Sequence, residues 1–556
     1  MALCHLMKDL LDPPPPQTDL RHPAQVMRPE RLGAMMPTRL SFLRVLTRQL
    51  SAEGARLTRP VWQIDAQGHG HAVYTIPLGG RPYSLVAVSC HLPDAMRTDR
   101  VIATAWDAGF VLYDGVPDAA EIARLCAAAP RQEAARFTER DLVLSRANKS
   151  VRLFTHVVDR LRAGAQPDPA RIAEVGYLMR TTAVYGNGKF GIADRGVIAG
   201  RPGIGGAFAA EMLTVWLIRC FTHDLVEHLG GAALEPALKR HLGIGNATGL
   251  GMAPFLVSHP VLLNNWMLAR ETALARVRAI GSLSETERDR LRALARRAAQ
   301  HLEAWQVPDP DAAARIARLR ADWPQVLDWL DALPERRPLD TLVRRGEHHS
   351  PDLQELLVAL VLEPFGALVD PLAAQMVEPP GAQPALFGDA VELRQAIAEQ
   401  FGWAVEIDFD APGAQQLFWY VSEEKREPRL GLRDTEPGAE RESPLDIARR
   451  VKALWQALDG VQDLAAFRQA HPHHELAIRR VQMAVFHPFS EIRGNLIGAG
   501  CRPVDMLRCK LALFGATGFD PKSDRWTRVT LAQGAPLPEE LGSPRADDWW
   551  LEVLQA

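Results

Sequence analysis

Between residues 58 and 115 the apolar residues follow a spacing that differs from that of the rest of the chain. The four segments TRPVWQID, GHAVYTIPL, YSLVAVSCHL and RVIATAWDAGFVLYDG are short, rich in β-branched and aromatic residues, and separated by Gly, Asp and Pro. Such runs are typical of strands, and Gly79-Gly80 fits a tight hairpin turn. The pattern predicts a small antiparallel sheet, preceded by a helix after Pro37 and followed by a helix that Pro117-Asp118 opens.

From residue 139 to residue 375 the apolar residues recur at helical spacing. We expect helices over residues 139–164, 168–183, 206–230, 259–279, 283–303, 308–333 and 351–375. Ser284 and Glu287 predict a capping box, and Asp309-Pro310 is typical of a helix start. Farther along we expect helices over 389–402, 445–458, 474–486 and 503–514, and strands at AVEIDFD and QQLFWYVSEE.

The predicted fold class is α+β and predominantly α-helical. It has a large helical core, a small N-terminal antiparallel sheet and a C-terminal mixed α/β region. The predicted segments are a tail at 1–36, a small α+β domain at 37–130, the helical core at 131–375, a linker at 376–388, and a C-terminal region at 389–556 that packs on the core. We expect the tail, with prolines at 13–16, to be mobile or to lie along the surface, and the pair Trp549-Trp550 to be exposed.

Composition excludes several classes of protein. Lys+Arg total 64 and Asp+Glu total 67, so the net charge of −3 argues against a nucleic-acid binder. The six cysteines form no CxxC pair and fit reduced thiols in a cytoplasmic protein rather than a disulfide framework or a zinc ribbon. Apolar runs stay shorter than a membrane span needs. We therefore expect a soluble cytoplasmic protein without nucleic-acid or membrane partners, and homo-oligomerisation stays open.

Two glycine-rich stretches interrupt the helical part. The first, at 185–195, contains Asn187, Gly188, Lys189 and Arg195, and the second, at 243–254, contains Asn246 and Thr248. Glycine lets backbone N–H groups approach a ligand, and a loop that feeds a helix N-terminus suits an anion. Neither stretch matches the Walker A or Rossmann fingerprint. The alternative is a pair of tight connections between packed helices, where glycine serves close approach.

A third polar segment, at 487–505, contains His487, Arg493, Asn495 and Cys501. A cysteine at a helix start, with Arg502 beside it, is expected to have a lowered pKa and partial thiolate character. Cys501 is therefore the candidate nucleophile, with His487 or His473 as its base. The alternative for Cys501 is a small thiol packed under a helix.

Two further patterns have a functional and a structural interpretation. His223 and Glu227 lie four residues apart on one predicted helix face and would suit a metal; otherwise they are solvated or paired. Arg426 and Arg429 follow a predicted strand. They would belong either to a solvated hairpin tip or to a substrate lid whose arginines hold an anion. No motif specifies a cofactor, and a divalent metal stays open.

Polar residues on glycine-containing connections favour an enzyme acting on a small carboxylate- or phosphate-bearing metabolite. Its small-molecule site would consist of the segments 185–195, 243–254 and 487–505. The candidate catalytic residues are Cys501, His487 and Lys189, and the candidate binding residues are Asn187, Gly188, Arg195, Asn246, Thr248, Arg426, Arg429, Arg493 and Asn495. The reaction class stays open. Two alternatives remain, a metal-dependent enzyme centred on His223 and Glu227, and a non-catalytic binding or assembly protein.

Overall fold

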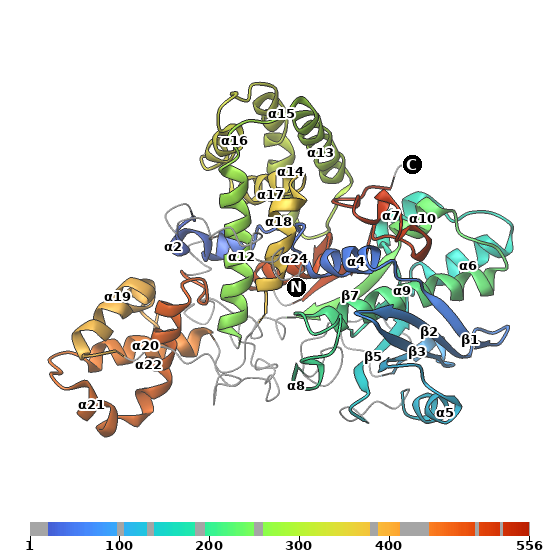
Figure 1. Ribbon diagram of the computed structural model, residues 1–556, viewed down its shortest axis with the longest axis horizontal. Helices are drawn as coiled ribbons and strands as arrows, with labels where there is room; N and C mark the ends of the chain where they lie inside the picture. Colours follow the sequence, from blue (N-terminus) through green and yellow to red (C-terminus); the bar gives the residue numbers. More distant parts are fainter. Residues whose placement is uncertain are drawn as a thin grey trace, which may run out of the picture.

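The structure is a computed structural model of the chain (Figure 1). It describes residues 20–96, 105–129, 138–183, 195–249, 259–377, 387–411, 444–494, 500–522 and 526–554. Helices and a mixed sheet make up these residues, so the α+β class is confirmed.

A nine-stranded sheet forms the centre of the molecule, with the strand order β1-β2-β3-β4-β5-β6-β7-β9-β8. Neighbouring strands are antiparallel except β6 and β7, which run parallel. The strands are β1 (Thr58–Ile64), β2 (Gly70–Leu78), β3 (Arg81–Ser89), β4 (Ala108–Asp114), β5 (Asp141–Lys149), β6 (Tyr177–Thr181), β7 (Gly243–Gly249), β8 (Gly518–Pro521) and β9 (Trp526–Leu531).

The first four strands confirm the sheet predicted between residues 58 and 115. Gly79 and Gly80, at φ values of 63° and 72°, form the two-residue turn between β2 and β3. Both positions need positive φ, which glycine adopts without strain. The small size predicted for the sheet is wrong, because five further strands extend it into the middle and the end of the chain.

Strands β5 and β6 occupy parts of the predicted helices 139–164 and 168–183, and β7 occupies the predicted glycine loop. Both faces of β5 are buried: Val143 belongs to the main core, and Leu144 to a second cluster with Leu125. A strand that is covered on both faces loses the alternation of apolar and polar residues that would identify it. The helical parts of the two predicted segments are α6 (Phe154–Arg162) and α7 (Pro169–Val175).

Two helices cover the two faces of the sheet. Helix α9 (Ala209–Gly230) contacts β2 through β7 and is buried around almost its whole circumference. Helix α5 (Ala119–Ala128), capped by Asp118 as predicted, packs on the other face over Val86, Val111 and Tyr113. The polypeptide between β6 and β7 therefore crosses one face of the sheet through α8 (Arg195–Ile198), α9 and α10 (Pro236–His241).

Most of the other helices form two groups beside the sheet (Figure 1). The upper group comprises α12 (Pro260–Arg278), α13 (Glu285–Ala304), α14 (Pro310–Asp322), α15 (Pro324–Asp331), α16 (Pro338–Gly346), α17 (Pro351–Leu362) and α18 (Gly366–Val369). The group at the lower left comprises α19 (Ala390–Glu406), α20 (Pro444–Ala457), α21 (Leu464–Ala470) and α22 (Glu475–Phe486).

Several predicted details of these helices are confirmed. Ser284 and Glu287 form the capping box of α13, and Asp309 caps α14 through the backbone N–H of Ala312. The strand predicted at AVEIDFD is wrong, because α19 continues to Glu406 and the residues after it are in no strand. The strand predicted at QQLFWYVSEE lies outside the described residues.

None of the described helices alone is long and apolar enough to cross a membrane. One bent pair, Pro351–Leu362 with Gly366–Gln375, meets the length and composition criteria when its two members are taken together, and it bends by 100°.

Both ends of the described chain are built into the core. Residues from Arg21 onward, including α2 (Pro23–Val26) and α3 (Pro29–Leu32), bury Val26 and Met27 completely, and α4 (Phe42–Ala52) follows. The prediction that Trp549 and Trp550 are exposed is wrong, because each is only 1% exposed. Trp550 Nε1 donates a hydrogen bond to the carbonyl of Pro37 at 3.2 Å, so the C-terminal segment closes over the N-terminal one.

Candidate functional site

The second glycine-rich stretch forms strand β7 rather than a loop, which corrects the prediction for 243–249. A Cβ atom on Gly245 would lie 2.6 Å from the ring of Tyr177, and one on Gly243 would lie 2.3 Å from the carbonyl oxygen of Leu531. Glycine therefore alternates along the strand because the neighbouring strands approach one face of β7 too closely for a side chain. Close approach, which was the structural alternative, accounts for these two glycines.

Because β6 and β7 are parallel neighbours, their carboxyl ends lie side by side. Past β6 the described chain stops at Ala183 and resumes at Arg195, and past β7 it stops at Gly249 and resumes at His259, just before α12. Asn187, Gly188 and Lys189 lie outside the described residues, as do the side chains of Arg195 and Thr248. Ligands of sheets with crossover helices bind beyond the carboxyl ends of neighbouring parallel strands.

Helix α9 runs back along this pair of strands. Arg219 Nε and His223 Nε2, in the middle of the helix, bond the carbonyl of Leu242, which immediately precedes β7. A Cβ atom on Gly79 would lie 2.5 Å from the backbone nitrogen of Gly203, so the residues before α9 lie against the turn between β2 and β3. That turn is at the end of the sheet where β6 and β7 end, so α9 begins toward the carboxyl end of β7. Phe208, just before that turn, is buried and has a φ of 55°, a conformation that a residue other than glycine adopts only under strain.

An aromatic cluster connects this first turn to three other helices. The ring of Phe208 lies 4.6 Å from that of Phe514 on α24 (Leu507–Phe514), 5.8 Å from Trp266 on α12 and 5.5 Å from Phe42 on α4, measured between centroids. The starts of α9 and α12 therefore come together with α24.

Three ionisable side chains are buried around the same cluster. Glu211 in the first turn of α9 is 4% exposed, His259 at the N-cap of α12 is 2% exposed, and Lys510 on α24 is fully buried. Lys510 Nζ lies 5.2 Å from the ring centroid of Phe514 and 6.0 Å from that of Phe208. Burying a charge is costly, and such groups gather at functional sites. The sequence signal for Lys510 is weak: the lysine directly precedes the apolar run LALF and follows Arg508 by two residues.

Asn246 is the one predicted binding residue on the parallel pair whose side chain is described. It is 1% exposed, and its Nδ2 donates to the carbonyl of Thr181 at 3.0 Å. Its Oδ1 is buried and accepts no hydrogen bond from the described residues. The hydroxyl groups of Ser145 and Thr181 share a hydrogen bond of 2.7 Å beside it. The parallel pair therefore carries a buried amide oxygen, Oδ1 of Asn246, that needs a hydrogen-bond donor.

The lowered pKa predicted for Cys501 is wrong. The thiol is 8% exposed, and burial raises its pKa to about 12. Arg502 does not activate the thiol, because both ends of its guanidinium group bond Asp309 at 2.7 Å. His487 is half-buried with a pKa lowered by burial, and His473 is exposed. Cys501 is thus a packed thiol, which was the alternative interpretation.

The rest of the segment 487–494 is also packed. The N–H of Phe489 donates to Oδ1 of Asn264 at 3.1 Å, which holds the segment against α12. Arg493 is buried, its N–H donates to the carbonyl of Met27 at 2.8 Å, and burial lowers the pKa of its guanidinium group. Asn495, Arg426 and Arg429 lie outside the described residues.

His223 and Glu227 each have a structural partner. Burial, with Arg219 nearby, lowers the pKa of His223 well below its usual range, and its Nε2 meets the carbonyl of Leu242. Glu227 accepts from the N–H of Leu234 at 3.0 Å and pairs with Lys239 at 3.1 Å. Within the described ranges, no three His, Cys, Asp or Glu side chains are grouped so that they could hold a metal ion.

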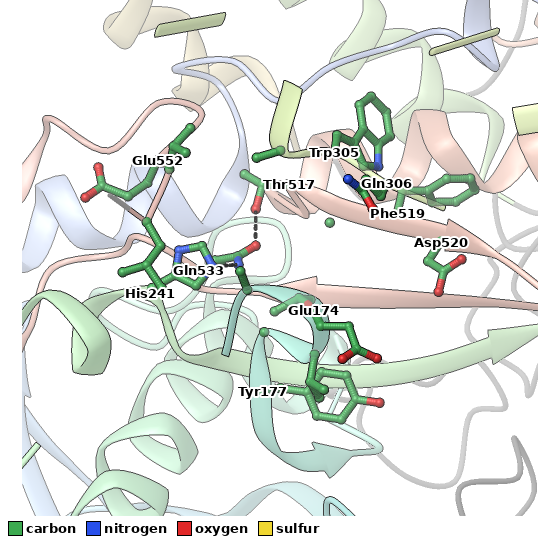
Figure 2. Close-up of a pocket in the computed structure, with 18 of the residues that line it drawn as sticks. Glu174, Tyr177, His241, Trp305, Gln306, Thr517, Phe519, Asp520, Gln533 and Glu552 are labelled. Atoms are coloured by element: carbon green, nitrogen blue, oxygen red, sulfur yellow. Dashed lines mark hydrogen bonds between the residues drawn. The ribbon is translucent and has the colours of Figure 1, made fainter. Parts of the chain in front are cut away.

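A cavity of about 150 Å³ lies at the opposite, amino end of β6 and β7 (Figure 2). Its walls come from the end of α7, the start of β6, α10, the end of α13, β8, β9 and the C-terminal segment. Sequence reasoning missed this cavity, because its walls come from segments that are distant along the chain.

No protein-family model, curated protein or solved structure matches this chain.

Proposed function

We propose that this protein is an enzyme that acts on a small carboxylate- or phosphate-bearing metabolite at the carboxyl ends of β6 and β7. One observation carries the proposal. The two adjacent ends of the parallel pair lead to helices α9 and α12, and buried ionisable side chains gather where those helices begin.

Each side chain has a chemical role that suits its type. Lys510 supplies a buried positive charge, whose attraction to an anion is stronger than it would be in water. Glu211 and His259 are candidates for moving a proton, since buried carboxyl and imidazole groups perform general acid–base chemistry. The starts of α9 and α12 add helix N-termini, which favour negative charge.

The strained Phe208 supports the same placement. A buried aromatic residue at positive φ costs of order 1–3 kcal/mol. Such strain persists where the surrounding structure fixes a functional geometry. Phe208 is the N-cap residue of α9, and its ring faces the ammonium group of Lys510.

The proposal includes a cytoplasmic location and a small-molecule partner. The five described cysteines are all free thiols, as a reducing compartment requires. Lys189 and Asn187 remain predicted contributors to the same site.

The proposal is tested by the substitution Lys510→Met. Methionine keeps the length and the apolar packing of the side chain but removes the charge. Turnover by the folded variant should fall by at least about a hundredfold, and its thermal unfolding is measured alongside, to show that the protein assayed is folded.

The matched control is Lys452→Met on α20, whose Nζ bonds the carbonyl of Ile407 away from the sheet. It should leave turnover unchanged. A Lys510→Met protein that unfolds, or that keeps full activity, would show that Lys510 is a structural residue and would refute the proposed site.

A further inference from the structure

Helix α5 carries a cysteine on the side that faces the sheet. Ile122, Leu125, Cys126 and Ala129 lie at positions i, i+3, i+4 and i+7, so they share one face of the helix. Leu125 and Ala129 are completely buried in the cluster between α5 and the sheet, and Ile122 and Cys126 pack against that cluster. The side chain of Cys126 therefore lies on the sheet side of α5.

A second cysteine directly follows β3, the strand that α5 contacts. Val86 and Val88 on β3 belong to the cluster under α5, and Cys90 packs against the same cluster. The N–H of Cys90 donates to the carbonyl of Asp107 at 2.8 Å, so the chain continues the extended pairing of β3 with β4 through this residue. Because alternate residues of an extended chain point to the same face of a sheet, Cys90 continues the row of side chains that faces α5.

Electrostatics also places the two sulfur atoms near each other. Burial, and after it the negative charge of a Cys90 thiolate, raise the pKa of Cys126. Burial and Asp107 raise the pKa of Cys90, whereas Lys149 lowers it. By contrast, the charges that act on the pKa of the other described thiols come from acidic and basic side chains, as they do for Cys220, Cys501 and Cys509.

The positions of the two cysteines in their elements allow them to approach. A disulfide needs Cα atoms about 4.4–6.8 Å apart. Cys90 follows Ser89, the last residue of β3, and Cys126 is two residues before Ala128, the last residue of α5. The ends of elements open and shift more easily than their middles. Both thiols are free and only partly buried, so a small reagent can reach them.

We propose that Cys90 and Cys126 form a reversible disulfide when the protein meets a small organic disulfide, such as oxidised glutathione. The thiolate of one cysteine attacks a sulfur of the reagent, forms a mixed disulfide and releases one small thiol. The thiolate of the other cysteine then attacks the protein sulfur of the mixed disulfide, and the second small thiol leaves. Two protein thiols are oxidised, one small disulfide is reduced to two thiols, and the two cysteine protons end on those thiols.

This modification site is separate from the proposed active site and does not depend on it. Helix α5 lies on the face of the sheet opposite to α9, at the lower right of Figure 1. Cys90 follows the end of β3 that is farthest from the Gly79-Gly80 turn, whereas the proposed active site lies at the same end of the sheet as that turn. The disulfide would join α5 to β3 and close the chain between residues 90 and 126, which lowers the entropy of the unfolded state.

The test is incubation of the native full chain with oxidised glutathione. The remaining thiols are then blocked with N-ethylmaleimide, and the digested protein is analysed by mass spectrometry. We expect a cross-linked pair of peptides that contain Cys90 and Cys126, and we expect dithiothreitol to separate them. Because burial raises the pKa of both thiols, thiolate is scarce at neutral pH, and the rate of cross-linking should rise about tenfold between about pH 7 and pH 8.

The substitution Cys126→Ser keeps the size of the side chain and removes its thiol. In this variant Cys90 should stop at the mixed disulfide with glutathione. Oxidation should raise the melting temperature of the unmodified protein but not that of the variant. Cys4→Ser is the matched control, because Cys4 lies outside the described residues, and this protein should form the same disulfide as the unmodified one.

Three results would overturn the proposal. The first is the accumulation of mixed disulfides on Cys90 and Cys126, or of unreacted thiols, without the cross-link at any concentration of oxidised glutathione. The second is a cross-link that forms only in urea, where the chain is unfolded. The third is cross-linking of Cys4 to either cysteine with equal yield, which would show that the fold does not select the pair.

Discussion

Cys501 and Lys510 are buried nine residues apart in sequence, and burial has different consequences for them. A thiol is neutral in its ordinary state, so burial merely stabilises that state and raises the pKa to about 12. A lysine ammonium group is charged in its ordinary state, so complete burial of Lys510 opposes its solvation. The first observation removes a candidate nucleophile, and the second identifies a candidate functional charge.

The chemistry of the thiols can be checked by alkylation of the native protein near neutral pH. Cys90 and Cys126 are half-buried, whereas Cys220, Cys501 and Cys509 are almost inaccessible. We expect iodoacetamide to label Cys90 and Cys126 at least about tenfold faster than Cys501, as followed by peptide mass spectrometry. Labelling of Cys501 first would restore it as a reactive cysteine.

A buried ion network involving Glu355 makes stability depend on pH. Although burial alone would raise the pKa of Glu355, ion pairs with Arg270, Arg21 and Arg31 lower it to about 2. The network also contains Glu271, which binds Arg21 at 2.6 Å. A carboxylate with a pKa lowered from 4.5 stabilises the fold above about pH 4.5, and this contribution of about 3 kcal/mol is lost as the pH falls toward 2.

We expect Glu355→Gln to lower stability by about 3–5 kcal/mol near neutral pH, because it leaves buried arginines without a counter-ion. The difference from the unmodified protein should shrink as the pH falls from about 7 to about 3. Melting temperatures across that range measure both effects. Glu303→Gln, at an exposed pair with Arg320, is the control. A Glu355→Gln protein that melts like the control at neutral pH would contradict this account.

At the scale of the element, β7 shows why glycine was misinterpreted. In GIGNATG the glycines at 243 and 245 share one face of a strand, where Tyr177 and the carbonyl of Leu531 occupy the space of a side chain. Sequence alone shows that glycine is frequent there, but not whether a turn or a close neighbour requires it. Periodicity predicts long helices such as α9, α12 and α13 well, because each repeats its pattern over several turns.

The substitution Gly245→Ala tests the packing of β7. Its Cβ would lie 2.6 Å from the ring of Tyr177, and we expect a loss of about 1–3 kcal/mol, as for other overpacked positions. Gly281→Ala, where nothing lies within 4 Å of the added carbon, should cost far less. Thermal unfolding of the two variants side by side provides the measurement, and equal melting temperatures would contradict the packing that we describe.

Over the whole molecule, the sheet joins parts of the chain that the sequence pattern separates. Strand β9, near the end of the chain, lies between β7 and β8, and β1 to β4 come from the beginning. Arg39 on the N-terminal side forms ion pairs with Asp370 at 2.6 Å and Asp547 at 2.7 Å, and so holds three distant segments together. Pairing between such segments leaves no local signal, which is why β8, β9 and the buried Trp549-Trp550 could not be predicted.

For the candidate site, the sequence suggested a region of the chain but not the residues. The glycine-rich stretches at 185–195 and 243–254 adjoin in sequence the region where we now propose the site, because the first follows β6 and the second begins with β7. The residues that we now favour, Glu211, His259 and Lys510, were not identified, because an isolated polar residue next to apolar ones is easily assigned to the surface. Only the packing of α9, α12 and α24 shows that they are buried.

The most direct test of the central claim is turnover by the full chain. The purified protein is incubated with a defined mixture of small carboxylates and phosphorylated metabolites, and the mixture is followed by mass spectrometry beside the Lys510→Met and Lys452→Met proteins. We predict that the unmodified and Lys452→Met proteins consume the same compound, and that the folded Lys510→Met protein leaves it unchanged. Consumption at equal rates by all three proteins, or consumption of none of the compounds by the unmodified protein, would contradict an active site at the carboxyl ends of β6 and β7.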